Sequence, residues 1–209
     1  MSELSQYGKP SGSAGNEIIA SMNEHHRELS EWALSMIEDD KPASILDIGC
    51  GGGMQISLMA DMFPDAEITG LDHSPDAVLS ASKLNSDLIA AGKCGIIEGS
   101  VKELPFGDGR FDLVTAFETY FFWPDLENSI AEACRTVAPG GKIMIVSETY
   151  PSLRFGLRNR KNKKLYGMNI VSNRRMRAML ETEGMSVMTE TRKQDNWVCF
   201  IGRKGPVSS

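Results

Sequence analysis

The segment from Ser44 to Gly53 constrains the fold of this chain more than any other stretch of its sequence. Ile45, Leu46 and Ile48 form a short apolar run with Asp47 inside it, and glycine then occupies positions 49, 51, 52 and 53. An apolar run that ends in glycines predicts a buried strand followed by a tight turn. Glycine adopts positive φ and lacks a Cβ, so this turn can approach a ligand closely. A helix is predicted over Met54–Phe63, and its free N–H groups suit a carboxylate or a phosphate, so we expect a cofactor-binding turn.

The glycine spacing distinguishes two classes of cofactor. A dinucleotide fingerprint, Gly-x-Gly-x-x-Gly, counted from Gly49 requires glycine at position 54, where this chain has Met54. The pattern Asp-x-Gly-x-Gly-x-Gly over residues 47–53 instead resembles motif I of the class I S-adenosylmethionine-dependent methyltransferases. That resemblance implies that S-adenosyl-L-methionine is the cofactor and that four residues of this stretch bind it: Asp47, Gly49, Cys50 and Gly51.

A second predicted strand, Glu67–Asp72, ends in an acid where nucleoside-binding sheets place their ribose carboxylate. We expect Asp72 to accept hydrogen bonds from both ribose hydroxyls; a surface aspartate that closes a strand is the alternative. The resemblance implies that His73 stacks on adenine. The family commonly carries an acid just after its third strand, but this chain has Ser100 and Val101 there. The Ser100 hydroxyl or the backbone is expected to serve in its place.

Two further elements carry the resemblance towards the carboxyl terminus. Residues 112–117 resemble the family's central strand, and residues 138–145, Ala-Pro-Gly-Gly-Lys-Ile-Met-Ile, resemble its closing motif. Four matching elements in the family's order over residues 44–147 identify the chain as a member, similar to the small-molecule methyltransferases of the ubiquinone and menaquinone pathways. The implied fold class is α/β, a Rossmann-like three-layer sandwich with a mostly parallel seven-stranded sheet. Alternating segments at Met185–Arg192 and Asn196–Arg203 predict its C-terminal antiparallel hairpin, which typical dehydrogenase sheets lack.

The expected domain organisation is a flexible arm at residues 1–14 and a single methyltransferase domain at residues 15–209. Ser- and Gly-rich composition without apolar period supports the arm. Residues 15–40 are expected to hold an amphipathic capping helix, predicted over Ile18–Ile37. Residues 148–171 are expected to be an insertion near the acceptor pocket.

The implied reaction is in-line displacement of a methyl group from the sulfonium by a small-molecule acceptor, with the reacting atoms held collinear and dry. A base is not strictly required. If one acts, His26 and Glu118 are the candidates. For His26 a buried core histidine is the alternative, and for Glu118 a role in orienting the methionyl part of the donor. The remaining expected contacts are Phe117 with the donor and three residues with the acceptor: Met22, Tyr120 and Arg158.

Aromatic residues follow the predicted central strand at positions 120–123. They either wall an apolar acceptor pocket and the cationic sulfonium or pack in the core. The asparagine/aspartate-Pro-Pro-aromatic element of amino-methylating nucleic-acid enzymes is missing here, which disfavours that class of substrate.

Charge is unevenly distributed along the chain. The net charge is −6, which argues against a general nucleic-acid partner. Residues 151–180 nevertheless contain nine Arg and Lys residues and no acid. This segment either attracts an anionic acceptor or forms a solvated face or a dimer contact.

The four cysteines lie apart, without the spacing of a metal site, which predicts reduced structural thiols, no metal and a cytoplasmic location. The sequence contains neither a spanning apolar stretch nor a signal-peptide core, so no membrane partner is expected. A monomer and a homodimer are both open. Two alternative functions remain: a non-catalytic S-adenosylmethionine-binding or regulatory protein, and an NAD-dependent oxidoreductase, which Met54 and the terminal hairpin oppose.

Overall fold

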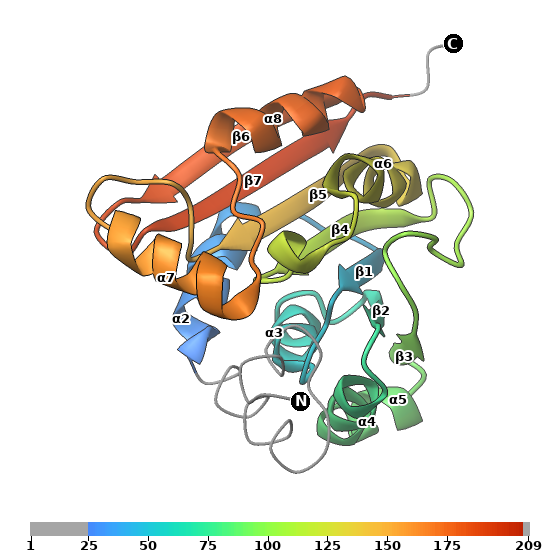
Figure 1. Cartoon of the computed structure of the whole chain (residues 1–209). Helices are drawn as coiled ribbons and strands as arrows, with labels where there is room; N and C mark the ends of the chain where they lie inside the picture. The colour runs from blue at the N-terminus through green and yellow to red at the C-terminus, as the bar shows by residue number, and fades with distance from the viewer. Residues whose placement is uncertain (1–24, 207–209) are drawn as a thin grey trace. The chain divides into compact units, whose positions relative to one another are not determined.

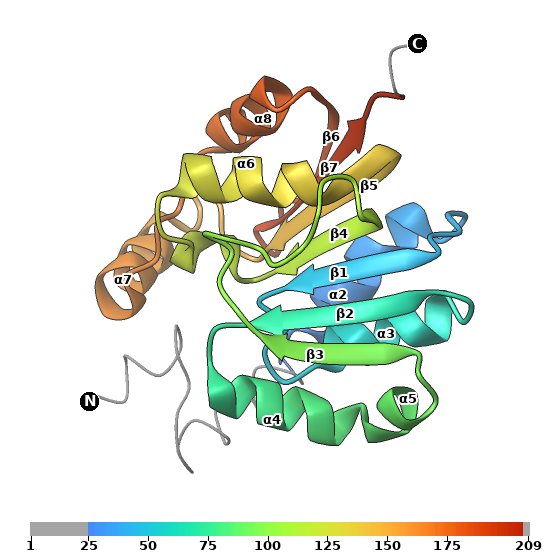
Figure 2. The ribbon, with the colours of Figure 1, turned by 90° about the vertical axis from the view of Figure 1, so that its right-hand side faces the viewer.

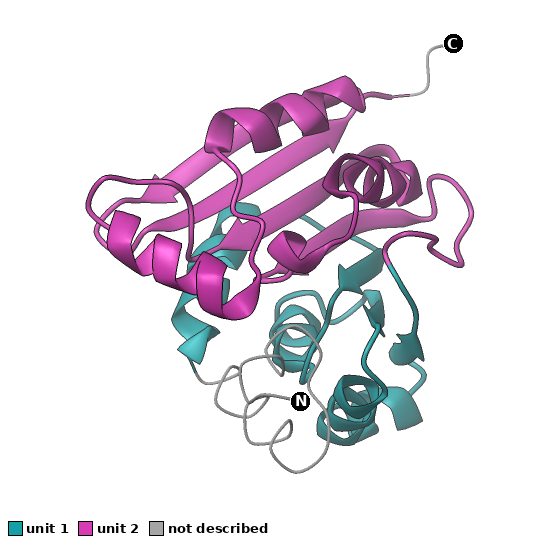
Figure 3. Cartoon of the chain, viewed as in Figure 1, with its two compact units in different colours: residues 1–100 teal, residues 101–209 magenta. Residues whose placement is uncertain are grey.

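The computed structural model describes residues 25–206 (Figure 1). Seven strands form one sheet in the order β3-β2-β1-β4-β5-β7-β6. The pairs β1–β2, β2–β3 and β4–β5 are parallel, and β7 pairs antiparallel with both β5 and β6, which confirms the predicted fold class. The chain divides into two compact units, residues 1–100 and 101–209, drawn in teal and magenta in Figure 3.

The first unit contains three parallel strands and the helices that follow them (Figure 2). Ile48 of β1 lies opposite Leu71 of β2, and Asp72 lies opposite Glu98 of β3. The three strands therefore end at the same edge of the sheet. Its elements are α2 (Arg27–Leu34), η2 (Ser35–Ile37), β1 (Ser44–Ile48), α3 (Met54–Met62), β2 (Glu67–Asp72), α4 (Pro75–Leu84), α5 (Ser86–Ala90) and β3 (Cys94–Glu98).

Ser74, Pro75 and Asp76 favour the start of a helix and predict one from Pro75 to about Ala91, but the structure has two helices there, α4 and α5. Asn85 lies between them with non-helical φ and ψ of −103° and 25°. Its side-chain N–H groups donate to the carbonyls of Gly53 and Ala81, both at 3.0 Å, and its side-chain oxygen accepts from the Ser57 hydroxyl at 2.8 Å. Asn85 thus leaves the helical conformation because its amide ties α4 to the glycine turn.

The amphipathic helix predicted near the amino terminus is described from residue 25 onwards. His26 is the N-cap residue of α2, and Leu29, Ala33 and Ile37 are buried on its predicted apolar face. Met22, the arm at residues 1–14 and the rest of the predicted helix lie outside the described residues.

The second unit contains the remaining strands and a helical crossover. β5 runs parallel to β4 and antiparallel to β7, and β7 pairs antiparallel with β6 as predicted. Its elements are β4 (Phe111–Phe117), η3 (Tyr120–Phe122), α6 (Leu126–Thr136), β5 (Val137–Ser147), α7 (Gly156–Tyr166), α8 (Asn173–Thr182), β6 (Met185–Arg192) and β7 (Trp197–Lys204).

Two boundaries in this unit differ from the sequence prediction. The Pro-Gly-Gly of residues 139–141 predicts a helix that ends at Ala138 and a strand that begins at Lys142. Helix α6 instead ends at Thr136 and β5 begins at Val137, which pairs with Phe111 of β4. The Pro-Gly-Gly of residues 139–141 forms an irregularity inside β5 instead of ending the helix. A Cβ on Gly141 would lie 2.8 Å from the Asp112 carbonyl oxygen, so only glycine fits this closely paired position.

The segment predicted as an insertion contains an eleven-residue helix, α7. The sequence gives no signal for α7, because its residues are mostly polar and show no helical apolar periodicity. Among residues 25–206, no helix is both long and apolar enough to cross a bilayer.

Candidate functional site

The glycine turn continues directly from β1. The N–H groups of Gly49 and Cys50 both donate to the Leu71 carbonyl, at 2.7 and 3.1 Å, which extends the pairing with β2 into the turn. Gly49, Gly51 and Gly53 have φ values of 75°, 52° and 81°. These left-handed conformations explain why the sequence has glycine at alternate positions.

Gly51 and Gly53 differ in what surrounds them. A Cβ on Gly53 would lie 2.5 Å from the Asn85 side-chain nitrogen and 2.9 Å from the Ala81 Cα, because α4 packs against it. A Cβ on Gly51 would meet no atom within 4 Å. The turn therefore packs on the protein at Gly53 and leaves its backbone open to a ligand at Gly51.

Asp72 holds the glycine turn to the end of β2. Its Oδ2 accepts from the Gly51 N–H and its Oδ1 from the Ser74 N–H, both at 2.9 Å. The sequence indicates only the ribose contact, because the bonds that give Asp72 this structural role join residues from two separate turns. Each carboxylate oxygen has a second lone pair, so Asp72 can accept further hydrogen bonds from a ligand while it holds the turn.

His73 and Ser100 lie beside Asp72 at the same edge. The His73 Nδ1 lies 3.6 Å from the Asp72 Oδ1, and about half of its side chain (48%) is exposed. The Gly99 N–H donates to the Asp72 carbonyl at 2.9 Å, which places the exposed Ser100 next to this strand end. The structure thus brings five predicted cofactor contacts of the first unit to one edge: Gly49, Gly51, Asp72, His73 and Ser100.

Asp47 and Cys50 lie deeper, since both side chains are buried. Burial, followed by the charges of Asp47 and Asp72, raises the pKa of the Cys50 thiol well above its usual value. Burial and the Asp47 charge raise the pKa of Cys94 to about 11. All four cysteines are buried and free, consistent with the predicted reduced structural thiols, and at neutral pH these two thiols are poor nucleophiles.

In the second unit, Glu118 immediately follows β4 and has a φ of 54°. Its N–H donates to the Val146 carbonyl at 3.0 Å, and its carboxylate accepts from the Glu148 N–H. Burial, followed by the negative charge of Glu148, raises the pKa of Glu118 well above its usual 4.5, although hydrogen bonds to its carboxylate and the Arg158 charge oppose the rise. Glu118 therefore links the carboxyl ends of β4 and β5.

The aromatic residues after Glu118 are mostly packed inside the protein. Tyr120, Phe121 and Trp123 are buried, and the Tyr120 and Phe121 rings meet edge to face with centroids 5.3 Å apart. Burial and the Glu118 charge raise the pKa of the Tyr120 phenol. Core packing thus accounts for three of the four rings. Val101 and Phe117, both expected to contact the donor, are buried as well.

Arg158 belongs to α7 and anchors that helix. One of its NH₂ groups donates to the Glu148 carbonyl at 2.7 Å, and its guanidinium carbon lies 4.5 Å from the centroid of the Phe155 ring. The next residue, Asn159, donates from its amide to the Tyr150 carbonyl at 2.6 Å. These bonds explain the position of Arg158 without an acceptor.

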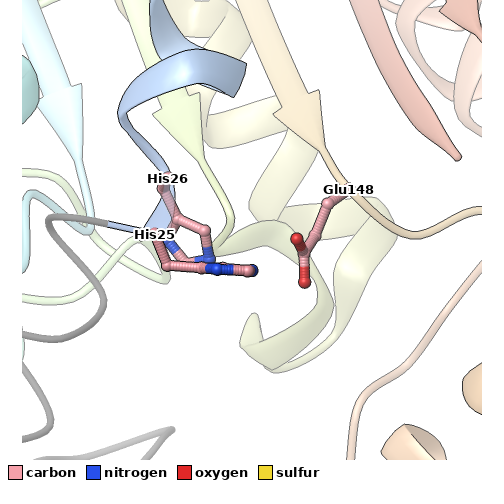
Figure 4. Close-up of side chains that lie close together, drawn as sticks. All are labelled: His25, His26 and Glu148. Atoms are coloured by element: carbon pink, nitrogen blue, oxygen red, sulfur yellow. The ribbon is translucent and has the colours of Figure 1, made fainter. Parts of the chain in front are cut away.

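His25 and His26 lie at the beginning of α2 (Figure 4). Their rings meet edge to face, with centroids 5.2 Å apart and an interplanar angle of 63°. The His26 carbonyl accepts from the N–H and the hydroxyl of Ser30, at 3.0 and 2.9 Å. Glu148, also drawn in Figure 4, belongs to the second unit and follows β5.

Comparison with known proteins shows what this arrangement resembles. Residues 46–145 match the family model described as Methyltransferase domain. Tocopherol O-methyltransferase, chloroplastic, from Arabidopsis thaliana is 34% identical over 119 residues, which are 57% of this chain and 34% of the plant protein. Demethylmenaquinone methyltransferase from Bacillus licheniformis is 30% identical over 134 residues, 64% of this chain and 56% of that protein. The chain thus spans about half or less of the length of these curated relatives.

Solved structures share the fold at lower identity. A chain in the complex of the Haloferax volcanii Trm112 methyltransferase activator with a methyltransferase has a TM-score of 0.79 and 17% identity, covering 90% of this chain and 94% of that one. Geranyl diphosphate C-methyltransferase from Streptomyces coelicolor, solved with geranyl diphosphate and S-adenosyl-L-homocysteine, has a TM-score of 0.76 and 14% identity, covering 95% and 86%.

Proposed function

Since residues 46–145 belong to the methyltransferase domain family, of the class I type, we propose that this protein transfers a methyl group from S-adenosyl-L-methionine to a small-molecule acceptor. One observation carries the proposal. The glycine turn and the Asp72 carboxylate meet at one edge of the sheet, and the turn is open at Gly51. A glycine turn with an open side and an acid at the end of the neighbouring strand are features of nucleoside-binding sheets.

The residues present fit this cofactor. No protein atom lies within 4 Å of the position that a Gly51 Cβ would take, and Asp72 retains acceptor capacity for ribose hydroxyls. His73 is exposed enough to stack on adenine, and Ser100 is exposed at the neighbouring strand end. Asp47 and Cys50 contribute to the packing of the turn, because both side chains are buried.

The bound cofactor supplies an activated methyl group on a sulfonium. The protein therefore needs chiefly to position the acceptor and exclude water, and a base is optional. Glu118 is suited to orientation, since its carboxylate already fixes the ends of β4 and β5. It remains a candidate base alongside His26, because a raised pKa brings a carboxylate closer to the range in which general bases act.

We further propose a lipophilic acceptor that carries a hydroxylated or quinonoid ring. The names of the two curated relatives, which refer to tocopherol and demethylmenaquinone, support this class. Phe122, the aromatic residue of η3 that is only partly buried, is a candidate contact for such a ring. Met22 and Tyr120 stay candidate acceptor contacts.

The test is methyl transfer with radiolabelled S-adenosylmethionine to a panel of acceptors: chromanols, demethylated menaquinols and, as polar controls, small amines. We expect label in the chromanol or quinol products and none with an Asp72→Ala variant. The fold alone does not guarantee methyl transfer, because the [4+2]-cyclase SpnF shares it with a TM-score of 0.72. Tight cofactor binding without transfer to any acceptor would support the non-catalytic alternative.

A further inference from the structure

Helix α7 presents an unusual outward surface. Leu157 and the basic residues three, four and seven positions after it share one face of the helix. Leu153 and Arg154, in the turn that leads into α7, are also exposed. We call this surface the α7 outer face: Leu153, Arg154, Leu157, Arg160, Lys161 and Lys164.

Hydrogen bonds attach the inner face of α7 to the second unit, and none of these bonds involves a residue of the α7 outer face. Arg158 donates to the Glu148 carbonyl and Asn159 to the Tyr150 carbonyl, and the Asn196 amide also donates to that second carbonyl at 3.1 Å. Gly167, with a φ of 68°, ends the helix. Hydrogen bonds within its own unit therefore fix the orientation of α7. The exposure of the leucines and bases on the α7 outer face follows from these bonds.

The exposed leucines are the part of this surface that a solvated charged face does not explain. Leu153 is fully exposed and Leu157 is 82% exposed. Within the part of the chain that the structure describes, no carboxylate pairs with Arg160, Lys161 or Lys164. Exposed apolar side chains among several bases offer the two contributions that hold a protein at an anionic membrane surface, burial of apolar area and attraction to the headgroups.

We propose that the α7 outer face binds the surface of a membrane that contains anionic phospholipids, with Leu153 and Leu157 inserted among the acyl chains and the bases on the headgroups. The eleven residues of α7 are too few to span a bilayer, so this is surface binding. The absence of a spanning segment led the sequence analysis to expect no membrane partner, but that argument does not address an interfacial helix.

Other partners explain the surface less well. Protein interfaces are depleted in lysine at their centre, whereas lysine is favoured beside anionic lipid headgroups. Nucleic acid would use the bases but gives exposed leucines no role, and the net charge of −6 opposes it. The proposal does not depend on methyl transfer, because lipid binding can be measured without S-adenosylmethionine.

The test is co-sedimentation of the full chain with vesicles of phosphatidylcholine, with and without phosphatidylglycerol, at low and high salt. We expect binding only to the anionic vesicles, and weaker binding at high salt. Each base near an anionic surface contributes roughly a fivefold increase in partitioning, so replacing three bases should reduce it about a hundredfold. Replacing both leucines should reduce it by at least about tenfold. The variants are Arg160→Ser/Lys161→Ser/Lys164→Ser, Leu153→Ser/Leu157→Ser and, as the matched control from the first unit, Leu79→Ser/Lys83→Ser/Lys93→Ser.

The control removes an exposed leucine and two exposed lysines elsewhere and should bind as the unchanged protein does. Failure of the folded protein to bind anionic vesicles would overturn the proposal. So would equal loss in the control. If sedimentation velocity showed a dimer that the α7 variants convert to a monomer, the partner would be a second copy of this chain. If an oligonucleotide bound and only the base variant lost it, the partner would be nucleic acid.

Discussion

Replacing Gly51 and Gly53 separately with alanine should distinguish a ligand-binding role of Gly51 from a structural role of Gly53. Both residues have positive φ, so each alanine carries a backbone cost of about 1–2 kcal/mol. At Gly53 the new Cβ also meets the Ala81 Cα at 2.9 Å and the Asn85 amide at 2.5 Å. Overpacking of this kind adds roughly 1–3 kcal/mol, for a total loss of about 2–5 kcal/mol.

At Gly51 the new methyl group meets no protein atom, so the free energy of unfolding should fall only by the backbone cost. The methyl group instead occupies the open side of the turn, and affinity for S-adenosylmethionine should fall more than tenfold. The assay pairs urea unfolding with isothermal titration for both variants. Equal stability losses, or unchanged cofactor affinity in Gly51→Ala, would refute the argument that the turn faces a ligand at Gly51.

Further predictions concern the second unit. Lys204→Met should lower the free energy of unfolding by about 2 kcal/mol, because the Lys204 Nζ donates to the carbonyls of Cys134 and Val137, at 3.0 and 2.8 Å, beside the end of α6. Urea unfolding measures this loss. A loss no larger than that of the exposed-site control Lys93→Met would contradict the prediction. Glu118→Gln should flatten the pH dependence of stability. The raised pKa of Glu118 contributes stability that is full below its usual 4.5 and is lost as pH rises through the folded-state value. As pH rises, the free energy of unfolding should therefore fall less in the Glu118→Gln variant than in the unchanged protein. An equal fall in both proteins would show that other groups cause the pH dependence.

The strand ends and glycines were predictable because each depends on a local pattern. The apolar run before Gly49 predicts β1, and an acid at the end of the next strand indicates a ribose contact at Asp72. Ser74 and Ser172 are favourable N-cap residues, and α4 and α8 begin directly after them. Both caps accept the expected N–H, at 3.4 and 3.2 Å. The seven-stranded sheet followed from the resemblance, and the alternating segments near the carboxyl terminus predicted its antiparallel hairpin.

The features that escaped prediction depend on contacts between distant residues. Asn85 breaks a helix because it reaches Gly53, far away in sequence, and no local propensity signals that. Helix α7 is held by bonds from Arg158 and Asn159 to a neighbouring loop rather than by an apolar stripe. The roles of the predicted catalytic and acceptor residues, and the cytoplasmic location, stay predictions.

The central claim is that the edge formed by the glycine turn and Asp72 binds S-adenosylmethionine. The most direct test is isothermal titration of the full chain with S-adenosylmethionine and S-adenosylhomocysteine, with NAD as a control ligand. Asp72→Ala is compared with Asp65→Ala, which removes an exposed acid from the same unit. The account predicts micromolar binding of both sulfur compounds, no binding of NAD, and loss only in a folded Asp72→Ala variant. Absence of binding by the folded protein, or equal affinity in Asp72→Ala, would contradict it.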